Sequence, residues 1–104
     1  MPIVEVCRVD ELPPGSRRIV RVGDPAVGVF NADGTLYAIE DRCSHDNGPL
    51  AEGEFDEERC IVICPRHGSE FDLRTGKPRT LPAYLPVSIY RVWAEAGQVL
   101  LELP

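Results

Sequence analysis

Short apolar segments separated by prolines and glycines make up most of this chain. The segments are rich in valine and isoleucine, which is typical of strands. No stretch has apolar residues at the spacing of an amphipathic helix three turns long. The pattern therefore predicts strands over residues 2–9, 17–23, 26–31, 35–41, 60–65 and 86–103, the last range being two strands joined around Gly97.

Turn signals organise these strands. Residues 31–34, Asn-Ala-Asp-Gly, separate two apolar runs and predict a hairpin. Between about residue 41 and residue 82 turn-forming residues dominate, so we expect a loop-rich subdomain inserted between strands of a β scaffold. The fold class expected is all-β, an antiparallel sandwich or barrel, with residues 1–104 forming a single domain.

Composition narrows the function classes. The chain has 104 residues, 43% of them hydrophobic, and a net charge of −6. The negative charge argues against nucleic acid or an anionic membrane as a partner. We see no secretory signal and no apolar run of about 20 residues, so we expect a cytoplasmic protein. Four cysteines in a reducing compartment indicate a metal site or buried thiols before disulfides.

Two Cys–His pairs are the main candidates for chemistry. Cys43 and His45 lie two positions apart, Cys64 and His67 lie three apart, and the chain has no other histidine. Thiolate and imidazole are ligands for iron–sulfur clusters and for zinc. Two loops side by side would supply four ligands. Residues that allow sharp turns flank both pairs: Gly48, Pro49, Gly53 and Gly68.

The segments "CSHDNGPLAEGEF" and "CPRHGSEFDLRTGKP" resemble the two cluster loops of bacterial Rieske-type [2Fe–2S] ferredoxins. The resemblance implies a Rieske fold in which Cys43 and Cys64 bind one iron while His45 and His67 bind the other. Neutral histidines replace two anionic thiolates, so the cluster accepts an electron more readily. Rieske potentials run from roughly −150 to +300 mV, against about −400 mV for plant-type ferredoxins.

The function implied by this resemblance is one-electron transfer by a monomeric ferredoxin that is not itself an enzyme. Its partners would be a flavin-dependent NAD(P)H reductase and a terminal oxygenase or similar acceptor. Three alternatives stay open. The chain could be the small Rieske subunit of a nitrite reductase, an accessory ferredoxin of iron–sulfur assembly, or a protein with a structural Cys₂His₂ zinc site.

Other residues receive weaker interpretations. Cys7 and Cys60 lie in predicted strands as small apolar residues without an assigned function, and a disulfide between them is disfavoured in the cytoplasm. The acidic run 52–59 is either a solvated connection or a docking surface for a basic partner. By resemblance, the loop with Pro82 and Pro86 covers the cluster; otherwise it is a simple turn between strands.

A comparison with high-potential Rieske proteins predicts a low potential here. Those proteins carry an extra cysteine in each cluster loop, at positions occupied here by Gly48 (or its neighbour Asn47) and Arg66. They also have a tyrosine that bonds a ligand sulfur, and Phe71 stands in its place. Ser69 retains their serine donor. With one donor kept, one lost and no disulfide, we expect a potential near or below about −100 mV.

Overall fold

The computed structural model describes residues 2–103, which form ten strands and one short 3₁₀ helix. No helix in this range is long and apolar enough to cross a membrane. The prediction of an all-β, antiparallel protein is confirmed. The elements are β1 (Ile3–Arg8), η1 (Val9–Glu11), β2 (Arg17–Val20), β3 (Val27–Ala32), β4 (Thr35–Glu40), β5 (Glu54–Asp56), β6 (Ile61–Ile63), β7 (Glu70–Asp72), β8 (Ile89–Tyr90), β9 (Val92–Glu95) and β10 (Gln98–Glu102).

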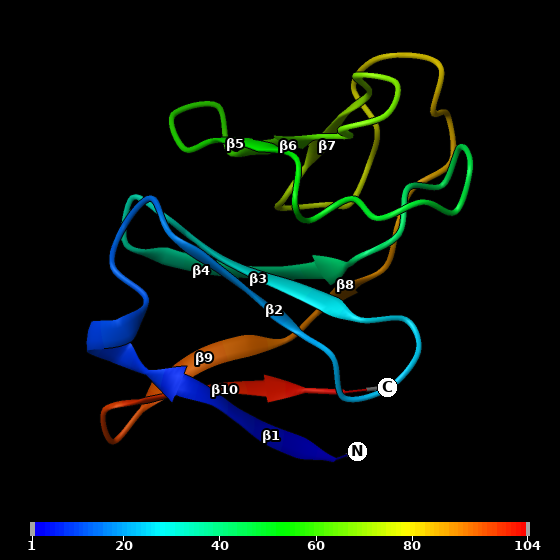
Figure 1. Ribbon diagram of the computed structural model, residues 1–104. Coiled ribbons are helices and arrows are strands. Elements are labelled where there is room, and N and C mark those ends of the chain that lie inside the picture. The colour runs from blue at the N-terminus through cyan, green and yellow to red at the C-terminus, as the bar shows by residue number, and fades with distance from the viewer. Residues whose placement is uncertain (1, 104) are drawn as a thin grey trace.

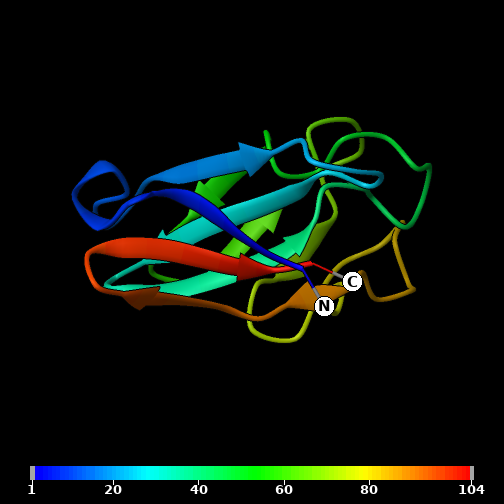
Figure 2. The same ribbon diagram turned by 90° about the horizontal axis from the view of Figure 1, so that it is seen from below.

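The strands form three sheets stacked as layers (Figure 1). The first sheet has the order β1-β10-β9, the second β2-β3-β4-β8 and the third β5-β6-β7. The second sheet lies between the other two. Seen from below, the first sheet crosses in front of the second (Figure 2). The fold is thus a β-sandwich to which a small third sheet has been added.

Strand β3 is buried at every position because both of its faces are covered. Side chains alternate between the two faces of a strand. Val27 and Val29 pack in the core between the first and second sheets, together with Val99 and Leu101. Phe30 lies in a second core, on the side of the third sheet. One strand therefore contributes to both hydrophobic clusters.

The predicted hairpin is confirmed as β3 and β4, paired from Val27↔Glu40 to Ala32↔Thr35. Its turn residues Asp33 and Gly34 have φ of 52° and 93°, as a tight hairpin turn requires.

The C-terminal prediction needs one correction. Residues 86–103 do not form two strands but three, because the chain changes sheet at Arg91. β8 pairs with β4 in the second sheet, and β9 pairs with β10 in the first. Strands that leave one sheet for another form the corners of sandwiches. The turn expected around Gly97 does join β9 to β10.

The region from 41 to 82 is more regular than expected, since it contains the whole third sheet. We predicted only the strand at 60–65, whereas β5 and β7 have three residues each and begin and end on acidic residues. Cys60 is not in a strand: its φ is 56°, and its N–H donates to the carbonyl of Glu57 in a turn. The acidic run 52–59 thus forms β5 and this turn. That residues 41–82 form a distinct subdomain of a single domain stays a prediction.

Residues 50–53, which lead into the third sheet, are held to the second sheet by polar contacts. The Arg17 guanidinium, on β2, donates to the carbonyl oxygens of Ala51 (2.6 Å) and Gly53. The Asp41 carboxylate, directly after β4, accepts from the N–H groups of Leu50 (2.8 Å) and Ala51 (2.6 Å). The backbone groups of residues 50, 51 and 53 thus form hydrogen bonds with side chains. Partly buried backbone groups need such partners because an unpaired one is costly.

Close packing between these layers depends on Gly28 of β3. A Cβ at this position would lie 2.5 Å from the Cβ of Ala51 and 3.0 Å from the Phe30 ring. Only glycine therefore lets residue 51 approach the strand this closely.

We predict that Gly28→Ala lowers the free energy of unfolding by about 2 kcal/mol, because the added methyl group overpacks the interface. The thermal midpoint should fall by roughly 10 °C. Adding Ala51→Gly to the same chain removes the opposing methyl group and should recover part of the loss. Strictly additive losses in the double variant would contradict the proposed contact.

Candidate metal centre

The two Cys–His pairs lie in two neighbouring loops at one end of the third sheet. The first loop, residues 43–48, follows β4, and the second, residues 64–69, joins β6 to β7. The β5–β6 turn with its acidic residues lies at the opposite end of the small sheet (Figure 1). The turn end of the acidic run therefore lies away from these loops, whereas its start, at Gly53, lies beside Pro65 of the second loop.

The first loop is closed by two backbone hydrogen bonds around Cys43. Its N–H donates to the carbonyl of Gly48 at 2.7 Å, and its carbonyl accepts from the N–H of Asn47 at 2.8 Å. Asn47 has a φ of 62°, a conformation that asparagine tolerates better than most residues. The sharp turn expected at Gly48 thus occurs one residue earlier.

The second loop repeats this pattern around Cys64. Its N–H donates to the carbonyl of Ser69 at 2.8 Å, and its carbonyl accepts from the N–H of Gly68 at 3.0 Å. Gly68 has a φ of 76°, so the turn expected here is confirmed. The two loops therefore present their cysteines in equivalent backbone settings.

The four predicted ligand residues come together as an inner pair and an outer pair. Cys43 and Cys64 are buried in the same hydrophobic cluster, and the Cys64 thiol lies close enough to raise the pKa of Cys43. His45 is exposed and the side chain of His67 is 42% exposed, with ring centroids 4.9 Å apart and ring planes at 90°. Two soft sulfur donors thus lie inside, and two imidazoles lie at the surface.

Burial raises the pKa of the Cys43 thiol, and contact with Cys64 raises it further. A metal ion must therefore displace a proton to bind this sulfur, as metals do at thiol sites. Among residues 2–103, no three side chains of the His, Cys, Asp and Glu types are grouped closely around one point that could hold a single ion. The donors instead form a sulfur pair and a nitrogen pair.

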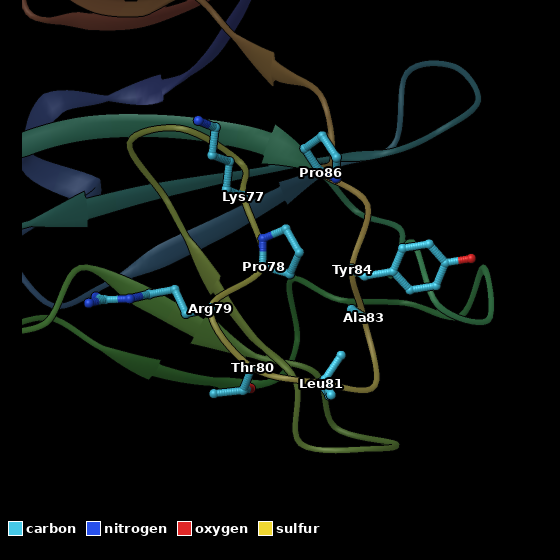
Figure 3. A pocket seen from close by; sticks show the side chains of 8 residues that line it. All are labelled: Lys77, Pro78, Arg79, Thr80, Leu81, Ala83, Tyr84 and Pro86. Atoms are coloured by element: carbon cyan, nitrogen blue, oxygen red, sulfur yellow. The ribbon is translucent and has the colours of Figure 1, made fainter.

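The proline-containing segment 81–87 is bound to both loops. The Ser44 hydroxyl donates to the carbonyl of Leu85 at 2.5 Å. The N–H of Ala83 donates to the hydroxyl of Ser69 at 3.0 Å, and Ser69 is fully buried. This segment also forms one wall of a groove of about 480 Å³, in which Lys77 and Tyr84 stand on different sides (Figure 3).

The sequence of this site matches a known protein family. Residues 3–91 match the family model described as the Rieske [2Fe-2S] domain. The chain belongs to this Rieske family. The match covers both loops, all strands of the second and third sheets and β1 of the first sheet, so it extends well beyond the Cys–His motif.

Individual Rieske proteins resemble this chain over nearly its full length. The 3-phenylpropionate/cinnamic acid dioxygenase ferredoxin subunit of Shigella flexneri serotype 5b is 39% identical over 97% of this chain and 93% of its own. The ferredoxin of carbazole 1,9a-dioxygenase from Nocardioides aromaticivorans is 36% identical, with a TM-score of 0.89 and 97% of both chains covered. A chain in a complex of reduced oxygenase and oxidized ferredoxin of carbazole 1,9a-dioxygenase is 33% identical, with a TM-score of 0.88 and 95% and 91% coverage.

The cofactor of this Rieske protein is a [2Fe–2S] cluster. Its chemistry fits the donors present, since two sulfurs suit one iron and two imidazoles the other. The zinc alternative is therefore set aside. We propose that Cys43 and Cys64 bind one iron and that His45 and His67 bind the second, as the loop resemblance implied.

Sequence reasoning missed Asp46, which the structure places against the outer pair. Its Oδ2 lies 3.1 Å from His67 Nε2 and 3.3 Å from Arg66 Nε, while its Oδ1 accepts from the N–H of Gly48 at 2.9 Å. The Gly48 hydrogen bond, the strongest influence, lowers the pKa of Asp46, and Arg66 adds to the effect. The acidic residue beside His45 was the only sequence signal.

Gly48 and Arg66 occupy the two positions that, by the resemblance, carry cysteines in high-potential Rieske proteins. A Cβ on Gly48 would lie 2.9 Å from the Arg66 Cδ, so positions 48 and 66 are neighbours. Neither residue has a thiol. The two loops are therefore linked there by the ion pair between Arg66 and Asp46 and not by a disulfide.

Cys7 and Cys60 lie in different cores, and the core of Cys60 also contains Cys43 and Cys64. Cys7 packs against the core between the first two sheets, and Cys60 belongs to the core under the third sheet. Both are free thiols. Burial raises the pKa of each, as is typical of structural cysteines.

We predict that Cys43→Ser or Cys64→Ser abolishes cluster assembly, because a serine hydroxyl is a poor substitute for a soft thiolate. His45→Cys or His67→Cys, where the cluster still assembles, should lower its reduction potential, because an anionic ligand replaces a neutral one. The measurements are iron and acid-labile sulfide, about two of each per chain in the unchanged protein, and the visible spectrum.

Cys7→Ala and Cys60→Ala are the matched controls and should leave the spectrum unchanged. Loss of the spectrum in either control would show that the ligand thiols were wrongly assigned. Stoichiometric zinc without labile sulfide, in protein made with ample iron, would contradict the cofactor itself.

Proposed function

We propose that this Rieske protein is the ferredoxin component of an aromatic-ring dioxygenase system. It carries one electron at a time from a flavin-dependent NAD(P)H reductase to a terminal oxygenase. The observation that supports this most strongly is the full-length similarity to ferredoxin subunits of such systems, at 39% and 36% identity. Those relatives are carriers, and the chain is likewise not itself the catalytic enzyme.

The residues of the site suit electron exchange with a partner. When bound, the cluster supplies a centre that takes up and gives back one electron. Cys43 and Cys64 hold the inner side within the hydrophobic core, away from water. His45 and His67 extend to the surface, where a docked protein can contact the imidazole edges. The outer pair thus shortens the path of the electron between proteins.

The surface beside the histidines has features of a docking site. Leu81, Tyr84 and Leu85 are 77%, 75% and 53% exposed in the segment that binds both cluster loops. Exposed apolar side chains gathered in one place indicate an interaction site. The net charge of −6 would attract a basic partner over longer distances. The acidic run 52–59 contributes to that field.

The relatives favour this role over the alternatives. They are named as dioxygenase ferredoxins of nearly the same length as this chain, and none of those reported above is a nitrite reductase subunit or an assembly protein. We further propose that the protein acts as a monomer in the cytoplasm, where NAD(P)H is available to its reductase.

The functional test is reconstitution of electron transfer. With NADH and the flavin-dependent reductase of a phenylpropionate-type dioxygenase system, the visible spectrum of the protein should change to that of the reduced cluster. Adding the terminal oxygenase, its aromatic substrate and oxygen should reoxidise it. The Cys64→Ser protein is the control without a cluster. A loaded protein that the reductase reduces but no oxygenase of this type reoxidises would contradict the proposed acceptor.

The buried residues around the sulfurs support a low reduction potential. Phe71 is fully buried in the core that contains both cysteines, and its ring has no hydrogen-bond donor. The Ser69 hydroxyl accepts from Ala83 and keeps its own hydrogen to donate. Hydrogen bonds to sulfur stabilise the more negative reduced cluster. One such donor is available where high-potential proteins have two.

We predict that Phe71→Tyr raises the reduction potential by roughly tens of millivolts, if the new hydroxyl reaches Cys43 or Cys64. Phe55→Tyr, two strands away in the same sheet, is the matched control and should leave the potential unchanged. Protein-film voltammetry compares the three proteins. A potential of the unchanged protein above about +150 mV would contradict both the tuning argument and the carrier role built on it.

A further inference from the structure

Asp46 and Arg66 form an ion pair directly beside the ring of His67. The carboxylate Oδ2 lies 3.3 Å from Arg66 Nε and 3.1 Å from His67 Nε2. The Asp46 side chain is only 17% exposed, whereas that of Arg66 is 57% exposed. The anion is thus the inner member of the pair and the cation the outer one.

The Oδ2 atom of Asp46 needs a partner. It is shielded from solvent, and within residues 2–103 no donor reaches it with good hydrogen-bond geometry. A shielded carboxylate oxygen without a hydrogen bond is costly. His67 Nε2 is the nearest ring nitrogen, so a proton on Nε2 and a small ring rotation would supply the missing bond. Nδ1 of the same ring is then the nitrogen left to bind iron.

We propose that Asp46 and Arg66 set the reduction potential of the cluster in opposite directions, through His67. The inference rests on the proposed role of His67 as an iron ligand. Asp46 acts as a positioning residue that holds the Nε2 proton and makes the imidazole a stronger electron donor. Arg66 partly neutralises that carboxylate.

The direction of each effect follows from the charge balance of reduction. One electron enters, the net charge becomes one unit more negative, and no bond forms or breaks. A fixed negative charge beside the site opposes this change, and a fixed positive charge favours it. A carboxylate that accepts the second N–H of a ligand histidine also raises the basicity of the ligand. Both effects of Asp46 therefore favour the oxidised protein.

The test uses Asp46→Asn and Arg66→Gln in the cluster-loaded protein. The amide oxygen of asparagine still accepts from the Gly48 N–H, so the turn is kept while the charge is lost. Arg8 and Asp10 form a matched control, since they are also 3.3 Å apart and lie around η1, far from the cluster loops (Figure 1). Their Asp10→Asn and Arg8→Gln variants change the net charge equally.

Protein-film voltammetry measures the potential, and iron, labile sulfide and visible circular dichroism verify the cluster. We expect Asp46→Asn to shift the potential upward, Arg66→Gln to shift it downward, and the double variant to lie between them. The control variants should shift it far less. Two shifts of the same sign, or shifts no larger than those of the controls, would overturn the inference.

Two further outcomes are decisive. If Asp46→Asn fails to load a cluster, Arg66→Gln alone tests the inference, since it keeps Asp46: a downward shift supports it, and an unchanged or higher potential overturns it. If His67→Ala retains the full cluster and spectrum, the ligand assignment is wrong, and the inference falls with it. The Asp46 and Arg66 variants thus test whether these charges set the reduction potential, and His67→Ala tests whether His67 is a ligand of the cluster.

Discussion

Strand β3 is covered on both faces, and this burial supports both hydrophobic cores and the position of the third sheet. Val27 and Val29 face one core, and Phe30 faces the other. Because Gly28 lies on the second face, the chain at Ala51 can approach the strand closely. A small domain buries little surface in a single core. Sharing one strand between two cores lets a chain of 104 residues support a third layer that holds the cluster loops.

The position of the metal centre is set by the third sheet, because both Cys–His loops lie at one end of it. Each cysteine begins a loop that is closed by its own backbone N–H and carbonyl, so the two sulfurs are fixed in the core. Side chains complete the arrangement: the Asp41 carboxylate holds the entry to the third sheet, and the Ser44 and Ser69 hydroxyls hold the proline-containing segment 81–87. The histidines extend past this frame to the surface. A dry inner side and an accessible outer side suit a protein that exchanges electrons by brief contact.

The ligands set the approximate reduction potential of the cluster, and nearby charges and hydrogen-bond donors then adjust it. In the proposed ligand set, two neutral imidazoles make the centre easier to reduce than one with four thiolates. We propose that Phe71 in place of a donor, and the carboxylate of Asp46 beside His67, act in the reverse direction. These residues lie on different elements and reach the site from opposite sides, inner and outer. The potential is therefore a property of the packing around the cluster as well as of its ligands.

Features that depend on neighbours along the chain could be predicted from the amino-acid sequence. The β3–β4 hairpin follows from Asn-Ala-Asp-Gly, and the Cys–His spacing indicated the cofactor and the residues proposed to bind it. The remaining features come from contacts between segments that are distant in the sequence. β5 and β7 are three residues long and are held by pairing with β6, so their own sequence gives little signal. Likewise, Arg17 meets Gly53, and Asp46 meets His67, across separate segments. Such contacts arise from the way layers pack, which local propensity does not specify.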